Sequence, residues 1–139
     1  FGPRQDPESL YAAVIPRFIT AMMSGQPPTI YGDGKQSRDF TYIDNVVHGN
    51  LLAAKAPLAA GKVMNLALGI SVSLLDLVEK INHALGTHYE PIFEPARQGD
   101  IRHSQANVDL ARELLGFSPV VDFDSGLALT ADWYRRQTA

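Results

Sequence analysis

The sequence predicts a small mixed α/β (α+β) domain, and three features indicate it. Short β-prone segments alternate with amphipathic helical patterns along the chain. Glycines and prolines separate these segments. The 139 residues are 45% hydrophobic and 19% charged, which is enough apolar material for one core. Because the predicted strands are short and irregularly spaced, we expect a small mixed fold.

The first two helices are predicted from apolar spacing and from residues that start or stop helices. Residues 12–25 (AAVIPRFITAMMSG) have apolar side chains at helical intervals, and Gly25 ends the pattern. Proline is tolerated only near the first turn of a helix, so Pro16 predicts that this helix begins a few residues before it. Residues 44–56 (DNVVHGNLLAAKA) predict a second helix, with Asp44 as its N-cap.

Small polar residues and glycines bound the later helical patterns. These comprise residues 73–86, capped by Ser73 and closed by Gly86, residues 108–116, ended by Gly116, and a last helix that follows Asp124 and Ser125. Short β-prone runs between the helices predict the strands. These runs are residues 27–31, 38–43 and 62–68, with a short extended piece at residues 89–95.

Composition excludes several classes of protein. The chain has no cysteine, which excludes disulfides, thiolate metal sites and cysteine nucleophiles. The net charge is −3, whereas nucleic-acid-binding proteins usually have a positively charged surface. No apolar run approaches the ~20 residues that span a bilayer. We therefore expect no nucleic-acid or membrane partner, and the cytoplasm as the compartment.

The chain begins with FGPRQDP, a loop-like composition without an initiator methionine. Domains rarely begin in the middle of a loop. We therefore expect the chain to be a piece of a longer protein.

Motifs for catalysis are missing from the sequence. The four histidines form no HExxH pattern, and there is no GxSxG elbow. The segment GDGKQS is not a phosphate-binding loop, and no GxGxxG follows a predicted strand. We expect no catalytic, cofactor-binding or metal-binding residue in this chain.

Arginines after tight turns indicate a binding site. Arg38 follows the turn in GDGKQSRDF, and Arg97 precedes Asp100 in ARQGDIRHS. Guanidinium groups suit bidentate contacts with phosphate oxygens, and two arginines from separate loops would suit a diphosphate. Alternatively both form surface ion pairs, of Arg38 with Asp39 or Asp44 and of Arg97 with Glu94 or Asp100.

Four segments occur in the same order in one family: FGPRQDP, GDGKQSRDFTYIDNVV, VMNLALGISVSLLDLVEKI and RQGDIRHSQANVDLARELLGF. Along essentially its whole length the chain resembles the C-terminal substrate-binding part of NAD-dependent epimerases/dehydratases, the extended short-chain dehydrogenases/reductases that act on nucleotide sugars. The resemblance is strongest to UDP-hexose and UDP-N-acetylhexosamine 4-epimerases. It implies that residues 1–139 are the C-terminal domain. It also implies an N-terminal Rossmann domain that binds NAD and carries a Tyr-x-x-x-Lys catalytic pair.

The resemblance also implies a UDP-sugar site. Arg38 matches the family's diphosphate clamp, Arg97 resembles its partner on the other side, and Asp100 matches the acid that binds the uridine ribose. Tyr31 matches an aromatic residue that lies against the uracil; otherwise it is a core tyrosine on a short strand. Further matches are Ala13 and Val14, whose backbone would reach the phosphates.

Ser104 matches a gatekeeper position that faces the C2 substituent of the sugar. A small residue there leaves room for an acetamido group, which a tyrosine would fill. The alternative is that Ser104 merely caps or precedes the helix near residues 107–116.

We therefore expect the UDP-sugar-binding portion of an NAD-dependent 4-epimerase, inactive by itself and able to self-associate through exposed apolar surface. The alternatives are the same portion of a dehydratase, decarboxylase or reductase of this family, or a non-enzymatic stand-alone domain.

Overall fold

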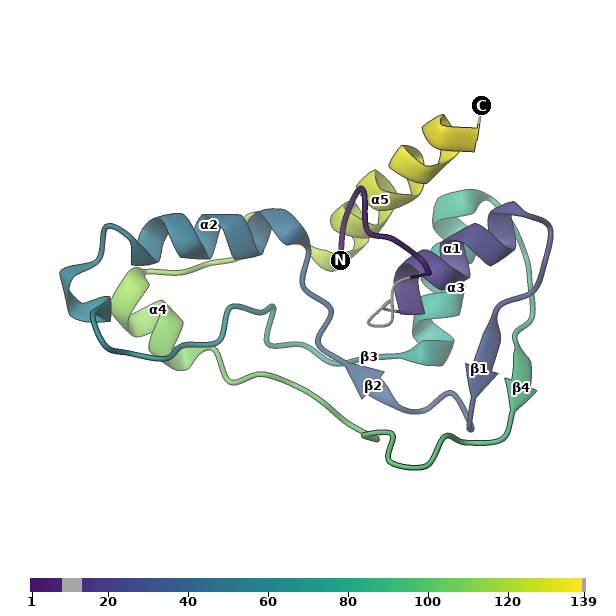
Figure 1. The fold of residues 1–139 in the computed structure, drawn as a ribbon, viewed down its shortest axis with the longest axis horizontal. Helices are drawn as coiled ribbons and strands as arrows, with labels where there is room; N and C mark the ends of the chain where they lie inside the picture. The colour runs from purple at the N-terminus through teal and green to yellow at the C-terminus, as the bar shows by residue number, and fades with distance from the viewer. Residues whose placement is uncertain (9–13, 139) are drawn as a thin grey trace.

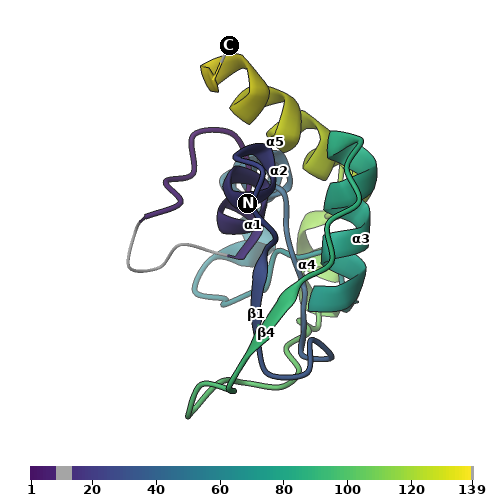
Figure 2. The same cartoon turned by 90° about the vertical axis from the view of Figure 1, so that its right-hand side faces the viewer.

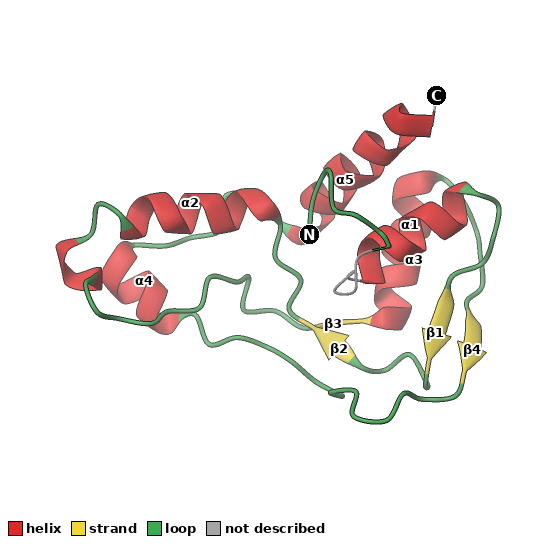
Figure 3. Ribbon diagram, viewed as in Figure 1, coloured by secondary structure: helices red, strands yellow, loops and turns green. Residues whose placement is uncertain are grey.

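Short strands alternate with helices in the computed structural model, which describes residues 1–8 and 14–138 (Figures 1 and 3). The helices are α1 (Val14–Met23), α2 (Ile43–Ala53), the 3-10 helix η1 (Pro57–Ala59), α3 (Leu74–Leu85), α4 (Asp109–Leu115) and α5 (Phe123–Thr138). The strands are β1 (Thr29–Tyr31), β2 (Ser37–Arg38), β3 (Val72–Ser73) and β4 (Ile92–Glu94).

The strands form two small sheets that bring distant segments together. β1 pairs in parallel with β4, with Thr29 opposite Ile92. β2 pairs antiparallel with β3, with Ser37 opposite Ser73. Figure 2 shows β1 and β4 side by side beneath the helices. The sheets therefore anchor residues 29–38 against segments that follow them by more than thirty residues.

Three amphipathic helices, α1, α3 and α5, enclose the main core beside β1 (Figure 2). Their apolar faces meet because each helix has its apolar residues on one side. The buried cluster contains Ile15, Phe18, Ile19, Met22, Ile30, Val72, Leu77, Val78, Ile81, Phe123, Leu127, Ala131 and Tyr134.

The predicted boundaries of α3 are confirmed. The Ser73 hydroxyl accepts a hydrogen bond from the Asp76 amide at 3.1 Å, and the Asp76 carboxylate accepts one from the Ser73 amide. This reciprocal capping box satisfies two amide groups at the helix start. Gly86 ends the helix at φ 70°, in the left-handed region that favours glycine. The predicted stops at Gly25 and Gly116 are also confirmed.

Two predicted helix starts were wrong. Asp44 lies inside the first turn of α2, whose N-cap is Tyr42. Asp124 and Ser125 lie inside α5, and Asp122 accepts hydrogen bonds from the amide and hydroxyl of Ser125 instead. These bonds stabilise the carboxylate and lower the pKa of Asp122.

Two predicted strands also differ from the structure. Of residues 38–43, only Arg38 is in a strand, because the chain leaves the sheet there and enters α2 at Ile43. Residues 62–68 form no strand, and Val63 is 93% exposed. A strand needs a neighbour to receive its hydrogen bonds. No strand pairs with this segment within the described residues.

Helices α2 and α4 lie together and extend to one side of α1, α3 and α5 (Figure 1). Only Asn45 and Gly49 are buried on α2, whereas Ile43, Val47 and Leu51 are each 44% or more exposed along one face. This apolar face has no cover within the described part of the chain. In that part, no helix is long and apolar enough to cross a membrane.

Candidate functional site

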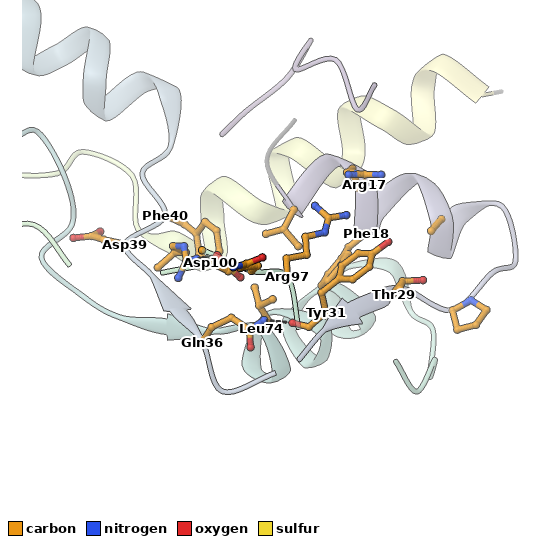
Figure 4. Close-up of a pocket in the computed structure, with 16 residues that line it drawn as sticks. Arg17, Phe18, Thr29, Tyr31, Gln36, Asp39, Phe40, Leu74, Arg97 and Asp100 are labelled. Atoms are coloured by element: carbon orange, nitrogen blue, oxygen red, sulfur yellow. Dashed lines mark hydrogen bonds and ion pairs between the residues drawn. The ribbon is translucent and has the colours of Figure 1, made fainter. Parts of the chain in front are cut away.

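A cleft of about 880 Å³ opens between α1, β1, β2 and the loop at residues 97–100 (Figure 4). It contains most of the predicted binding residues. Its lining consists of Val14, Arg17, Phe18, Ala21, Pro27, Thr29, Tyr31, Gln36, Arg38, Asp39, Phe40, Leu74, Arg97, Gln98, Gly99 and Asp100.

The Gly-Asp-Gly turn joins β1 to β2 at the edge of this cleft. Gly32 and Gly34 have φ values of 94° and 75°, which residues other than glycine rarely adopt. A Cβ at Gly34 would also lie 2.8 Å from Leu75. The Asp33 carboxylate accepts the Lys35 amide at 3.0 Å and so closes the turn. The turn returns the chain to β2 and places Arg38 in the cleft.

Arg38 forms an ion pair with Asp100, at 2.6 Å between Nη2 and Oδ1. The alternative prediction, an ion pair of Arg38 with Asp39 or Asp44, was wrong. Arg38 also donates to the backbone oxygen of Ser37 at 2.8 Å. The guanidinium group is therefore fixed between its own strand and the loop at residues 97–100.

Arg97 lies over the ring of Tyr31, with Cζ 3.8 Å from the ring centre. Arg97 makes this cation–π contact and forms neither of the two alternative ion pairs, with Glu94 or with Asp100. Asp100 is paired with Arg38 instead. Tyr31 is half-buried in the wall of the cleft and is not one of the core residues. Tyr31 and Arg97 therefore lie in the same cleft, and the prediction that they bind a ligand there remains a prediction.

A second ion pair ties the turn to the opposite loop. Arg102 Nη2 lies 2.8 Å from Asp33 Oδ2. The hydrogen bond from Arg102 and the one from the Lys35 amide lower the pKa of Asp33. Arg102 therefore stabilises the loop and is not a lining residue of the cleft.

Ser37 joins three segments below the cleft. Its hydroxyl accepts a hydrogen bond from the Ser71 hydroxyl at 2.7 Å and lies 2.9 Å from His103 Nδ1. Its backbone amide donates to Arg102, and its oxygen accepts from the Ser104 amide. These contacts hold residues 102–104 against β2 and set the distance between the two sides of the cleft.

The remaining predicted site residues are placed differently. Val14 begins α1 and lines the cleft, whereas Ala13 lies outside the described residues. Ser104 is exposed and is not a lining residue. It precedes α4 without capping it, because the N-cap of α4 is Val108. The gatekeeper role of Ser104 remains a prediction.

Sequence reasoning missed three contributors to the site. Arg17 faces the cleft from α1, on the side opposite the buried Ile15 and Ile19. The helical spacing of apolar residues in α1 could have indicated that Arg17 lies on the exposed side. The buried Gln36 side chain donates to the Tyr31 oxygen at 2.6 Å. Asp39 accepts the amides of Leu68, Gly69 and Ala106, and only the fold brings these groups together.

Comparison with known proteins gives matches along the chain. The model of the NAD dependent epimerase/dehydratase family matches residues 1–67. A UDP-glucose 4-epimerase from Mycolicibacterium smegmatis is 36% identical over 99% of this chain and 44% of that protein. The chain is similar along its whole length to the C-terminal part of proteins of the NAD-dependent epimerase/dehydratase family.

Solved structures of NAD-dependent epimerases/dehydratases match the fold. The UDP-glucose 4-epimerase of Thermotoga maritima with UDP-glucose has a TM-score of 0.94 and 35% identity, covering 100% of this chain and 44% of that one. The UDP-N-acetylglucosamine 4-epimerase of Methanobrevibacter ruminantium in complex with UDP-N-acetylmuramic acid has a TM-score of 0.91 and 41% identity, covering 99% and 44%.

Other epimerase/dehydratase relatives at 30% identity or more include a dTDP-glucose 4,6-dehydratase and a UDP-N-acetyl-glucosaminuronate decarboxylase. The chain spans less than half the length of the curated relatives it matches. Within its described residues, no group of three His, Asp or Glu side chains is placed to hold a metal ion.

Proposed function

We propose that this chain is the UDP-sugar-binding portion of an NAD-dependent UDP-hexose/UDP-N-acetylhexosamine 4-epimerase. The observation that carries the proposal is one cleft in which Tyr31, Arg38, Arg97 and Asp100 meet from strands and loops that are distant in sequence. An aromatic ring, two guanidinium groups and a carboxylate are the groups that a base, a diphosphate and a ribose require.

Each group has a role in this proposal. Tyr31 lies against the uracil, and Arg38 and Arg97 contact the diphosphate. Asp100 accepts hydrogen bonds from the ribose hydroxyls, because a carboxylate accepts two donors and Arg38 contacts only Oδ1. Backbone amides at the start of α1, near Ala13 and Val14, face the phosphates.

We propose further that residues 1–139 form a C-terminal domain whose preceding Rossmann domain packs on the exposed apolar face of α2. Supporting this, the matched relatives are more than twice as long as the chain. Ile43, Val47 and Leu51 are apolar and exposed on one helix face. Without that domain, the same surface favours self-association, measurable by light scattering over a range of concentrations.

The chain's own residues do not fit an NAD site. β1 leads through the Gly-Asp-Gly turn into β2, and a dinucleotide-binding turn leads into a helix. NAD therefore belongs to the parent enzyme's Rossmann domain, where it would supply hydride transfer. We expect no turnover of UDP-galactose by the chain alone, and the cytoplasm as the compartment of the parent enzyme.

Titration of the purified chain with UDP tests the binding role. We expect weak, saturable binding, because the Rossmann domain that would complete the cleft in the parent enzyme is absent. Arg38→Ala should weaken binding, whereas Arg112→Ala, which removes an exposed pair on α4, should not. Equal binding by wild type and Arg38→Ala would contradict the proposal.

Substrate size tests the role of Ser104. We expect the parent enzyme to interconvert UDP-GlcNAc and UDP-GalNAc alongside the plain hexoses. Ser104→Tyr should abolish turnover of the acetylated sugars and spare UDP-glucose and UDP-galactose. A parent enzyme that handles only plain hexoses would show that Ser104 is not a gatekeeper.

The second candidate is the same portion of a dehydratase or decarboxylase. Relatives of both kinds match the chain at 30% identity or more. Product analysis of the parent enzyme with UDP-glucose and UDP-glucuronate separates these reactions from epimerisation. Absence of binding to any nucleoside diphosphate would instead favour a non-enzymatic stand-alone domain.

A further inference from the structure

The charged residues that line the cleft are three arginines and two aspartates. Both aspartates are already engaged. Asp100 pairs with Arg38 at 2.6 Å. Asp39 accepts the amides of Leu68 and Gly69 at 3.2 and 3.0 Å, and Figure 4 shows it pointing away from the other labelled side chains. The two remaining guanidinium groups, of Arg17 and Arg97, are therefore not neutralised by a carboxylate of the cleft.

Arg17 and Arg97 both line the cleft, and they come from different elements. Arg17 projects from α1, while Arg97 projects from the loop after β4 and rests on the Tyr31 ring (Figure 4). Within residues 1–8 and 14–138, neither guanidinium forms an ion pair, and none of residues 9–13 is Asp or Glu.

We propose that Arg17 is a further binding residue and that it joins Arg97 and Arg38 in holding the diphosphate of a nucleoside diphosphate sugar. This inference rests on the proposed function and deepens it. Such a diphosphate bridge carries two negative charges, which match the two uncommitted guanidinium groups. The Tyr31 ring holds the guanidinium of Arg97 in place before the ligand arrives, which reduces the entropy lost on binding.

Arg38 then has a different part in the same site. Its Nη2 donates to Asp100 and its Nη1 to the Ser37 oxygen, so much of its hydrogen-bonding capacity is used within the protein. It positions Asp100 and adds to the positive potential, while Arg17 and Arg97 make the larger contribution to the contacts with the phosphates.

The test compares UDP, UMP and uridine by chemical-shift titration of the wild-type chain, R17Q, R17K and the control R112Q. We expect R17Q to bind UDP roughly tenfold more weakly, the loss of one charge-assisted contact. R17Q should bind uridine like wild type and show a shallower salt dependence with UDP. R17K should retain part of the affinity. R112Q should match wild type, because Arg112 lies on α4 and pairs with Asp109.

Equal UDP affinity of R17Q and wild type would overturn the inference and leave the proposed function intact. An equal loss for UDP and uridine would also overturn it, because Arg17 would then act on the nucleoside. If wild type binds no UDP, inorganic pyrophosphate is the probe. Pyrophosphate binding that R17Q weakens would support the anion site and contradict the proposed function; no pyrophosphate binding would overturn both. Unchanged melting temperatures of the variants verify that each one folds.

Discussion

The half of the molecule around α1, α3 and α5 differs from the arm formed by α2 and α4. In the first half, the fully buried helical residues include Ile15, Ile19, Leu77, Ile81, Leu127 and Thr130. In the arm, α2 buries only Asn45 and Gly49 and exposes three large apolar side chains. The first half has a core of its own, whereas the arm retains an apolar face without cover in the described residues.

This difference shows which surfaces serve a ligand and which serve another part of the protein. The cleft is built on α1, β1 and β2 beside the packed core, so its charged side chains project from supported elements. The arm buries Val108, Ala111 and Phe117 but leaves one apolar face of α2 exposed, so we expect its stability to depend in part on its attachment to the first half. Four experiments test this contrast.

The largest expected effect is in the main core. Ile81 on α3 is fully buried, and Ile81→Ala should lower the free energy of unfolding by about 2–5 kcal/mol. Leu51→Ala on α2 is the matched control, because Leu51 is 58% exposed and its truncation leaves no cavity. The control should change stability by about 0.5 kcal/mol or less. Urea denaturation measures both, and similar losses would remove the contrast between the two regions.

Two glycines with nearly equal φ angles distinguish the cost of backbone strain from the cost of crowding by a neighbouring side chain. Gly34 has φ 75° and Gly61 in the arm has φ 71°. A Cβ at Gly34 would meet Leu75 at 2.8 Å, whereas nothing lies within 4 Å at Gly61. Gly34→Ala should cost roughly 2–4 kcal/mol and Gly61→Ala about 1 kcal/mol. Equal shifts in thermal denaturation would mean that the backbone alone determines the cost.

Asn45 attaches the arm to the rest of the chain. Its side chain is fully buried, donates to the Val121 oxygen at 2.7 Å and accepts the amides of Val120 and Val121. Asn45→Ala should cost about 1–3 kcal/mol by leaving these groups without partners. Hydrogen exchange should show faster opening of α2 than of α3. Asn50→Ala on the exposed side of α2 should leave that exchange unchanged.

The smallest expected effect is electrostatic. Asp33 is exposed, and Arg102 lowers its pKa below the ordinary value of 3.8. A carboxyl with a lowered pKa in the folded state stabilises the fold above its ordinary pKa, and this contribution disappears as pH falls through the lowered value. Asp33→Asn should therefore reduce thermal stability slightly at pH 7 and not at pH 2. A pH-independent difference would show that the effect does not come from the charge of the carboxylate.

Local signals in the sequence predicted the helices well. The Ser73 cap and the stops at Gly25, Gly86 and Gly116 depend on neighbouring residues alone, so they are visible without the fold. Strand 62–68 was predicted wrongly because a strand depends on a partner, and none pairs with it in the described residues. The β-propensity of a segment indicates that it can form a strand, but it does not show whether a neighbouring strand is available to pair with it.

The site was predicted in part for the same reason. The resemblance identified Tyr31, Arg38, Arg97 and Asp100, and the structure places all four in one cleft. The pairing of Arg38 with Asp100 and the position of Arg97 over Tyr31 depend on tertiary contacts, so spacing suggested the wrong ion pairs. Arg17 looked like an ordinary exposed residue of an amphipathic helix.

The contacts that close the cleft also bear on the order in which the chain folds. Arg38 and Asp100 are 62 residues apart, and Ser37 and His103 are 66 apart. Such contacts form only after a long loop closes, whereas α3 carries its own start and stop signals and can form locally. The Arg97–Tyr31 contact should therefore form late in refolding. Because Trp133 and four other tyrosines also fluoresce, a resolved NMR signal of the Tyr31 ring is the reporter of that final step, and it should lag behind the recovery of helical circular dichroism.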